Sequence, residues 1–142
     1  MKKIAFFGLG IFLIHLYSCK NTLSEKPTEE ILRDTVLFQN PTSILFQDTV
    51  LDLGEVKEGA KVDFNFIFTN SGKFPLLLHS VKPSCGCTVA DYPKYPVAAG
   101  KIDTIKGSFN SEGRLGSHEK HIEVVSNSER KVNTLIFKIK VN

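Results

Sequence analysis

From residue 43 onward, apolar and polar residues alternate with a period of two, the spacing that half-buried β-strands produce. The clearest run places an apolar side chain at every second position, namely Val62, Phe64, Phe66 and Phe68. Further apolar runs, separated by turn residues, occupy residues 44–46, 50–53, 75–81, 105–109, 121–125 and 135–141. About seven short strands without a convincing long helix predict an all-β domain, an immunoglobulin-like antiparallel β-sandwich over residues 43–142.

The first 18 residues follow a different pattern. Lys2 and Lys3 precede an apolar run from residue 4 to residue 16, and Ser18 stands directly before Cys19. A positive start, a short apolar stretch and a small residue at the exit are the parts of a secretory signal peptide. The apolar run of about 13 residues is shorter than the roughly 20 that cross a bilayer.

The end of this segment is similar to the lipobox of bacterial lipoproteins, in which the cysteine is acylated, for example with palmitate, and the peptide before it is removed. We therefore interpret residues 1–18 as a lipoprotein signal peptide and Cys19 as the lipid attachment site. Plain secretion and a retained membrane anchor are the alternatives. The interpretation predicts a protein of the bacterial cell envelope, lipid-anchored to the membrane and either periplasmic or surface-exposed.

Residues 19–42 are polar and mixed in charge, with Pro27 and Pro41 as interruptions. We predict that they form a flexible tether, which holds the domain away from the lipid. The alternative is an extra strand or helix docked on the domain, because Ile31, Leu32 and residues 36–38 are apolar.

Composition narrows the classes of function. Without residues 1–18 the basic residues fall from 18 to 16, because Lys2 and Lys3 are lost, against 15 acidic residues. A chain with so little net charge lacks the positive electrostatic field that would attract the many phosphates of a nucleic acid. No nucleic-acid partner is therefore expected. Hydrophobic residues make up 42% of the chain and include eleven Phe. They are sufficient for the core of one folded domain.

Cys85 and Cys87 are the cysteines that remain if Cys19 carries lipid, and an oxidising envelope compartment would let them pair. Residues i and i+2 of an extended strand lie near the outer limit for a disulfide, but Gly86 allows a tighter backbone. We favour a structural or labile disulfide. Three alternatives remain open: a soft-metal site for Cu(I) or Zn, a thiol-redox catalyst, and two reduced, inert cysteines. A metal site would need a further ligand brought in by folding, such as His79, His118 or His121.

Tyr92 and Tyr95 lie in a proline-rich stretch and are candidates for a partner-binding loop, because exposed aromatic side chains bind proteins or glycans. The alternative is that the two rings cap the core. No Ser/His/Asp arrangement and no glycine-rich phosphate loop stands out, so we predict no catalytic residue, no cofactor and no metal ligand.

The predicted function is a lipid-anchored, non-catalytic binding module whose partner is the membrane through its anchor and a protein or glycan of the envelope. The expected binding surface is one loop, residues 83–100, which carries both cysteines and both tyrosines. The alternative function is a periplasmic metal-handling or thiol-redox factor that uses Cys85 and Cys87.

Short motifs along the domain support the fold. They are residues 51–59, with the pattern hydrophobic-D-hydrophobic-G-x-hydrophobic-x-x-G, residues 66–72, Pro75-Leu76, Ser84-Cys85-Gly86-Cys87-Thr88 and Val124-Val125-Ser126-Asn127. Together they resemble the bacterial domain-of-unknown-function family fifteen seventy-three, which is common among lipoproteins of the Bacteroidetes type. That family is related to the immunoglobulin-like modules of the Hydin and ASPM group. The resemblance spans roughly residues 45–141 and implies the same sandwich, with no established activity.

Overall fold

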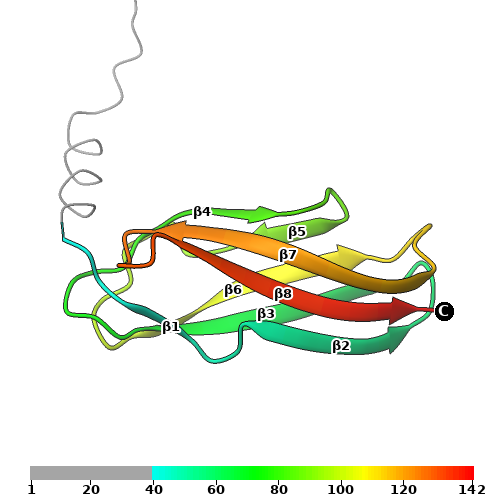
Figure 1. The fold of residues 1–142 in the computed structure, drawn as a ribbon, viewed down its shortest axis with the longest axis horizontal. Coiled ribbons are helices and arrows are strands. Elements are labelled where there is room, and N and C mark those ends of the chain that lie inside the picture. Colours follow the sequence, from blue (N-terminus) through cyan, green and yellow to red (C-terminus); the bar gives the residue numbers. More distant parts are fainter. Residues whose placement is uncertain (1–39) are drawn as a thin grey trace, which may run out of the picture.

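The computed structural model describes residues 40–142 and confirms the predicted all-β, immunoglobulin-like sandwich, in which two four-stranded sheets pack face to face (Figure 1). In one sheet the order is β1-β3-β6-β5, with bounds Ile44–Phe46, Lys61–Asn70, Ile102–Asn110 and Thr88–Asp91. In the other the order is β2-β8-β7-β4, with bounds Val50–Val56, Val132–Val141, Gly116–Ser126 and Leu78–Pro83. The predicted signal peptide, Cys19 and nearly all of the tether lie outside the described residues. Within residues 40–142, no helix is both long and apolar enough for a membrane span.

The strand pairing differs from the expected pattern in two respects. The described residues form eight strands and not about seven, because residues 88–91 form β5 in a stretch expected to be loop. In addition, β2 pairs with β8 in parallel, with Val50 opposite Ile136 and Val56 opposite Val141. Figure 1 shows that β2 continues in the direction of β1 while the chain changes sheets. The chain therefore does not reverse its direction before β2, and a reversal there would have made the pair with β8 antiparallel.

The inward faces of the two sheets meet in a core of alternating residues, as expected. Buried members include Phe64, Phe66, Phe68, Ile105, Phe109, Leu135, Phe137, Ile139 and Val141. The ring centroids of Phe64 and Phe137 lie 4.5 Å apart across the sandwich. Gly107 is opposite Phe64 in the register of β3 and β6, and a Cβ at that position would lie 2.2 Å from Phe64 Cε2. The Phe64 ring thus fills the space that a side chain at position 107 would need.

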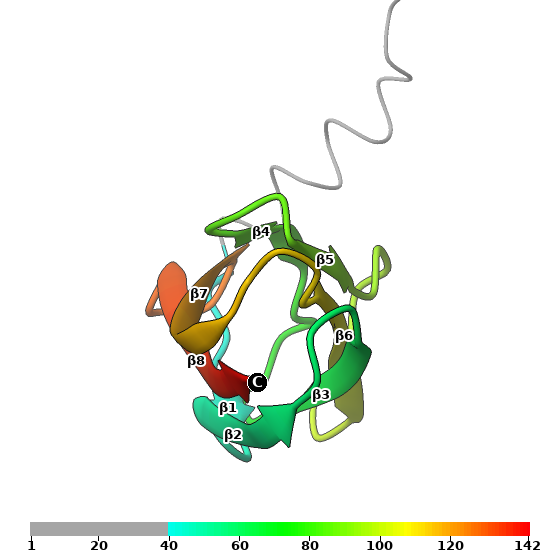
Figure 2. The ribbon, with the colours of Figure 1, turned by 90° about the vertical axis from the view of Figure 1, so that its right-hand side faces the viewer.

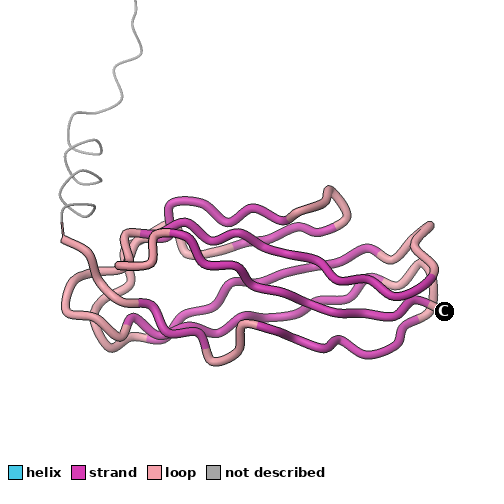
Figure 3. The backbone as a smooth tube through the Cα atoms, in the orientation of Figure 1, coloured by secondary structure: helices cyan, strands magenta, loops and turns pink. Residues whose placement is uncertain are grey.

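The loops gather at the two ends of an elongated sandwich (Figure 3). Viewed along the long axis, the sheets curve toward each other, and β5 of one sheet lies beside β4 of the other (Figure 2). The described chain enters at one end, and Asn142 lies at the opposite end (Figure 1). We call these the entry end and the far end.

One buried amide fixes the entry end. Asn70 Nδ2 donates to the carbonyl oxygens of Phe74 and Val97, both at 2.8 Å. Its Oδ1 accepts from the Thr42 hydroxyl at 2.9 Å and from Gly72 N at 3.1 Å. Both protons and both lone pairs of the amide are therefore used. Thr42, the last residue assigned to the tether, is buried by these contacts.

Candidate functional site

The expected binding stretch, residues 83–100, is not one continuous loop. Strand β5 (Thr88–Asp91) divides it, so that the cysteines precede the strand and the tyrosines follow it. Four strand residues span about 10 Å, and they separate the two groups along the edge of the sheet. The expectation of a single loop was wrong, and the two groups form separate candidate sites.

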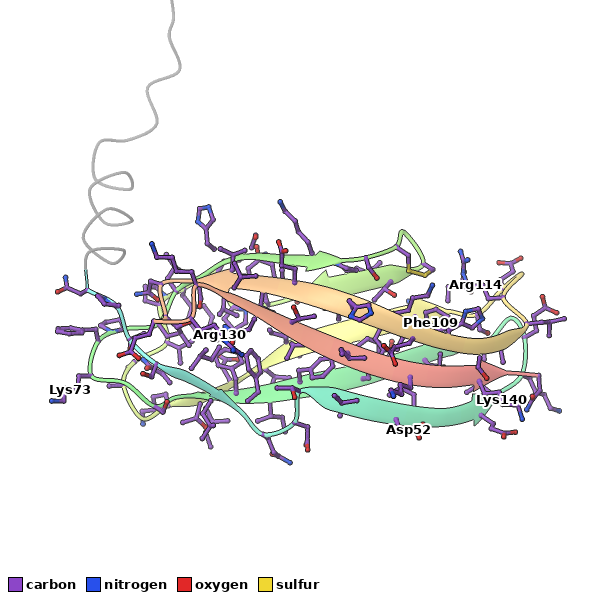
Figure 4. All side chains as sticks on the ribbon, in the orientation of Figure 1. Asp52, Lys73, Phe109, Arg114, Arg130 and Lys140 are labelled. Carbon is purple, nitrogen blue, oxygen red and sulfur yellow. A yellow bond between two sulfur atoms is a disulfide. The ribbon has the colours of Figure 1, made fainter. Side chains whose placement is uncertain are left out.

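Cys85 and Cys87 are joined by a disulfide in the turn between β4 and β5, drawn as the yellow bond in Figure 4. Their Cα atoms lie 5.3 Å apart, which is within the usual range for a disulfide. Cys87 is buried in the core, and Cys85 packs partly buried against it. The turn is held by Thr88 N, which donates to Cys85 O at 3.3 Å, and by Ser84 N, which donates to His121 O at 2.9 Å. The disulfide lies where the chain crosses from one sheet to the other.

The histidines considered as metal ligands do not join the cysteines. Among residues 40–142, no group of three or more His, Cys, Asp or Glu side chains is placed to hold a metal ion. His118 Nε2 lies 2.6 Å from Arg114 O, and His121 Nε2 lies 3.7 Å from Glu119 Oε1. Because the two sulfur atoms are bonded to each other, neither is available as a thiolate ligand in this state.

The two tyrosines differ in their surroundings. Tyr95 is 60% exposed, and its hydroxyl donates to Asp103 Oδ2 at 2.9 Å. This hydrogen bond, together with the negative charge of Asp103, raises the pKa of Tyr95 above its ordinary value. Tyr92 packs partly buried against the core, and Lys94 Nζ lies 2.9 Å from its ring centroid. Core capping therefore describes Tyr92, whereas the ring of Tyr95 is open to solvent.

Tyr95 belongs to a groove of 340 Å³ on the edge of the β1-β3-β6-β5 sheet, which we call the Tyr95 groove. Its lining residues are Asp91, Tyr92, Pro93, Lys94, Tyr95, Asp103, Thr104 and Lys106. Asp91 of β5 is the register partner of Lys106 of β6, so opposite charges lie side by side in the groove. Beyond these two residues the outer sheet face is hollowed further, toward Asp63 and Asn65 of β3. An aromatic ring beside a few fixed polar groups can orient a polar ligand.

The tyrosines of this groove were expected from the sequence, but its β6 residues were not. Asp103, Thr104 and Lys106 reach the groove because β6 pairs with β5 and because the Tyr95 hydroxyl binds Asp103. Their polar side chains are ordinary for the outer face of a strand, so no local pattern marks them.

A family model and several solved structures are similar to this chain. The model, described as protein of unknown function (DUF1573), matches residues 44–141. A protein of unknown function from Porphyromonas gingivalis W83 is 20% identical, with a TM-score of 0.64 over 71% of this chain and 47% of that chain. The chain thus spans about half the length of that protein. The ASH/PapD-like domain 7 of human CEP192 is 11% identical, with a TM-score of 0.56 over 72% of this chain and 85% of that domain.

The YadV chaperone is 16% identical, with a TM-score of 0.51 over 70% of this chain and 52% of the chaperone. No curated protein matches the chain. At these identities the likeness to solved structures shows the fold alone, a PapD-like and immunoglobulin-like sandwich. Neither the family match nor these neighbours gives a positive sign of catalysis.

Proposed function

We propose that the chain, which belongs to the DUF1573 family of proteins of unknown function, acts as a non-catalytic interaction module held in the bacterial cell envelope by lipid on Cys19. The observation that carries the proposal is the Tyr95 groove, an open surface where an exposed ring is fixed beside charged groups. Rigid sheets that position loops for binding support this role. The partner is a protein or a glycan of the envelope.

A photo-reactive amino acid that replaces Tyr95 is expected to crosslink one recurrent envelope component in living cells, because the ring at this position is open to solvent. The matched control replaces Leu115, which is 65% exposed in the turn between β6 and β7. Asp91→Ala and Lys106→Ala, which change the paired charges of the groove, should lower the yield from position 95. Lys61→Ala, at an exposed position of β3 outside the groove, should not. No crosslinked species from position 95, or the same species from both positions, would contradict the proposed role of the groove.

Lipid attachment rests on the pattern around Cys19 and is tested separately. The intact mass of the native protein should equal a chain that begins at Cys19 plus attached fatty chains. Cys19→Ser should abolish incorporation of labelled palmitate. An unmodified mass, or labelling that persists in Cys19→Ser, would refute the anchor and leave the test of the groove intact.

The alternative, a periplasmic metal-handling or thiol-redox factor, has one observation in its favour. Cys85 is only partly buried, and a reductant must reach a sulfur atom to open a disulfide. Elemental analysis of the purified protein, with thiol titration before and after reduction, separates the two functions. We expect no stoichiometric metal, and two thiols that appear only after strong reduction. Bound copper or zinc, or a bond that glutathione opens readily, would favour the alternative.

A further inference from the structure

The entry end of the sandwich carries four exposed cations and an exposed aromatic ring. The cations are Lys73, Lys101, Arg130 and Lys131, and none of them forms an ion pair within residues 40–142. Phe74, which follows Lys73 directly, is 45% exposed. Figure 4 shows Lys73 and Arg130 at the end where the described chain enters. We call these five residues the basic end.

The loops that carry these residues are fixed relative to one another. Asn70 N donates to Lys101 O at 2.9 Å, and the Asn70 side chain donates to Phe74 O at 2.8 Å. Thr42 connects the third loop, because its carbonyl oxygen accepts from Glu129 N at 2.9 Å while its hydroxyl donates to Asn70. The three loops therefore form one preorganised surface.

Acidic groups near this surface leave an excess of positive charge. Glu129 is exposed in the β7–β8 loop, and the Asp103 carboxylate accepts the hydrogen bond from Tyr95. Four cations minus these two carboxylates leave two positive charges. The far end carries less excess charge, because Lys57, Lys61, Arg114 and Lys140 are opposed there by Glu55, Glu58 and Glu112. Lys140 Nζ lies 2.9 Å from Glu55 Oε1 at this end (Figure 4). One positive charge is left at the far end, so the excess at the entry end is larger.

We propose that the basic end docks on a membrane surface of anionic phospholipids, with the four cations at the phosphates and Phe74 at the boundary of the acyl chains. Anionic headgroups attract each nearby Lys or Arg, and a buried apolar ring adds hydrophobic free energy. The direction of the chain agrees with docking of this end, because the described chain enters here after the 21 residues from Cys19 to Gln39, which reach at most about 75 Å when extended. The inference rests on the proposed lipid anchor only for the membrane's proximity. Docking would direct the far end away from the bilayer.

The test uses residues 20–142, which contain all eight strands but neither Cys19 nor the segment before it, so that binding reports the protein surface alone. Flotation measures binding of the protein to vesicles of phosphatidylcholine alone and to vesicles that also contain phosphatidylglycerol. We expect binding only to the anionic vesicles and weakening with salt. The double variant Lys73→Ser, Lys101→Ser should bind about 25-fold more weakly, at about fivefold per cation. Phe74→Ser should weaken binding as well.

The control Lys57→Ser, Lys61→Ser removes the same charge from the far end, at the turn after β2 and at the first residue of β3, and should bind as the parent does. An equal loss in both double variants would show that net charge alone drives binding and would overturn the proposal. Equal binding to neutral vesicles, or none to anionic ones, would do the same. The proposal would also be overturned if the parent protein were a dimer and the Lys73→Ser, Lys101→Ser variant a monomer, because the basic end would then bind a second copy. None of these outcomes changes the acylation of Cys19 or the crosslinks from position 95, so the two proposals fail separately.

Discussion

Asn70→Ala is expected to lower the free energy of unfolding by about 4 kcal/mol, at about 1 kcal/mol for each of the four hydrogen bonds that its side chain makes. Domains of this size are stable by roughly 5–15 kcal/mol, so the variant would keep only part of the native stability. Urea denaturation followed by circular dichroism measures the loss as a shift of the midpoint.

The effect is large because the site is buried and offers no replacement partner. Asn70 has no exposed surface, and its amide bridges three segments that are distant in the sequence. Alanine would leave the carbonyl oxygens of Phe74 and Val97 without this donor, and the Thr42 hydroxyl without its acceptor. Each unsatisfied buried group costs about 1–3 kcal/mol unless water reaches it. The entry-end loops would also lose their fixed arrangement, so vesicle binding by the basic end should fall with stability.

Two further variants separate hydrogen bonding from volume. Asn70→Asp keeps the shape and the acceptor but directs a carboxylate oxygen at two carbonyl oxygens. It should therefore destabilise at least as much as alanine. Asn65→Ala, an exposed Asn on the same strand, should change stability by less than about 0.5 kcal/mol. If Asn70→Asp were as stable as the parent, the donor role assigned to the amide would be wrong.

The sequence was sufficient to predict the strands whose inner faces form the core. In β3 and β8, large apolar residues stand at every second position, and the structure buries Phe64, Phe66 and Phe68 of β3 as expected. The prediction succeeds because alternate side chains of a strand point to the same face, so every second residue is buried when that face packs on a partner sheet. The prediction needed no knowledge of the neighbouring strands.

Pairing and strand ends were harder to predict, because they depend on residues far away in the chain. β5 has only four residues, and its Val89 is exposed although it is apolar. Nothing in the pattern of β5 itself therefore distinguishes it from a loop. In β2, the register shifts between Asp52 and Glu55. There Gly54 has a φ of 73°, and its N donates to Asp52 Oδ1.

The candidate sites show the same limit. Cys85, Cys87 and Tyr95 were found from residue type and local spacing, which are visible in a sequence. At Asn70 the sequence shows only a residue type that favours turns. The role of Asn70 depends on the carbonyl oxygen of Val97, 27 positions later, and no local pattern reports such a contact.

Gly107→Ala is expected to lower the free energy of unfolding by about 1–2 kcal/mol, because the new methyl group would overlap the Phe64 ring. Local backbone preference predicts the opposite sign. Gly107 is not among the glycines with positive φ, and alanine in place of a strand glycine is worth about 0.5–1 kcal/mol. A Cβ would, however, lie 2.2 Å from Phe64 Cε2, and overpacking a close-packed core costs about 1–3 kcal/mol or more. Phe64 cannot retreat easily, since its ring lies 4.5 Å from that of Phe137. The clash therefore outweighs the gain.

A double-mutant cycle assigns this loss to the Phe64 ring. Phe64→Ala alone should cost about 3–5 kcal/mol through the cavity that it leaves. The combination with Gly107→Ala should cost less than the sum of the two, by at least about 1 kcal/mol, because the methyl group then enters space that the ring vacated. Gly86→Ala is the matched control, since a Cβ there would meet no atom within 4 Å and its φ is not positive. Additive effects would show that the methyl group at position 107 disturbs β6 itself, and the proposed competition between side chains for one space would be wrong.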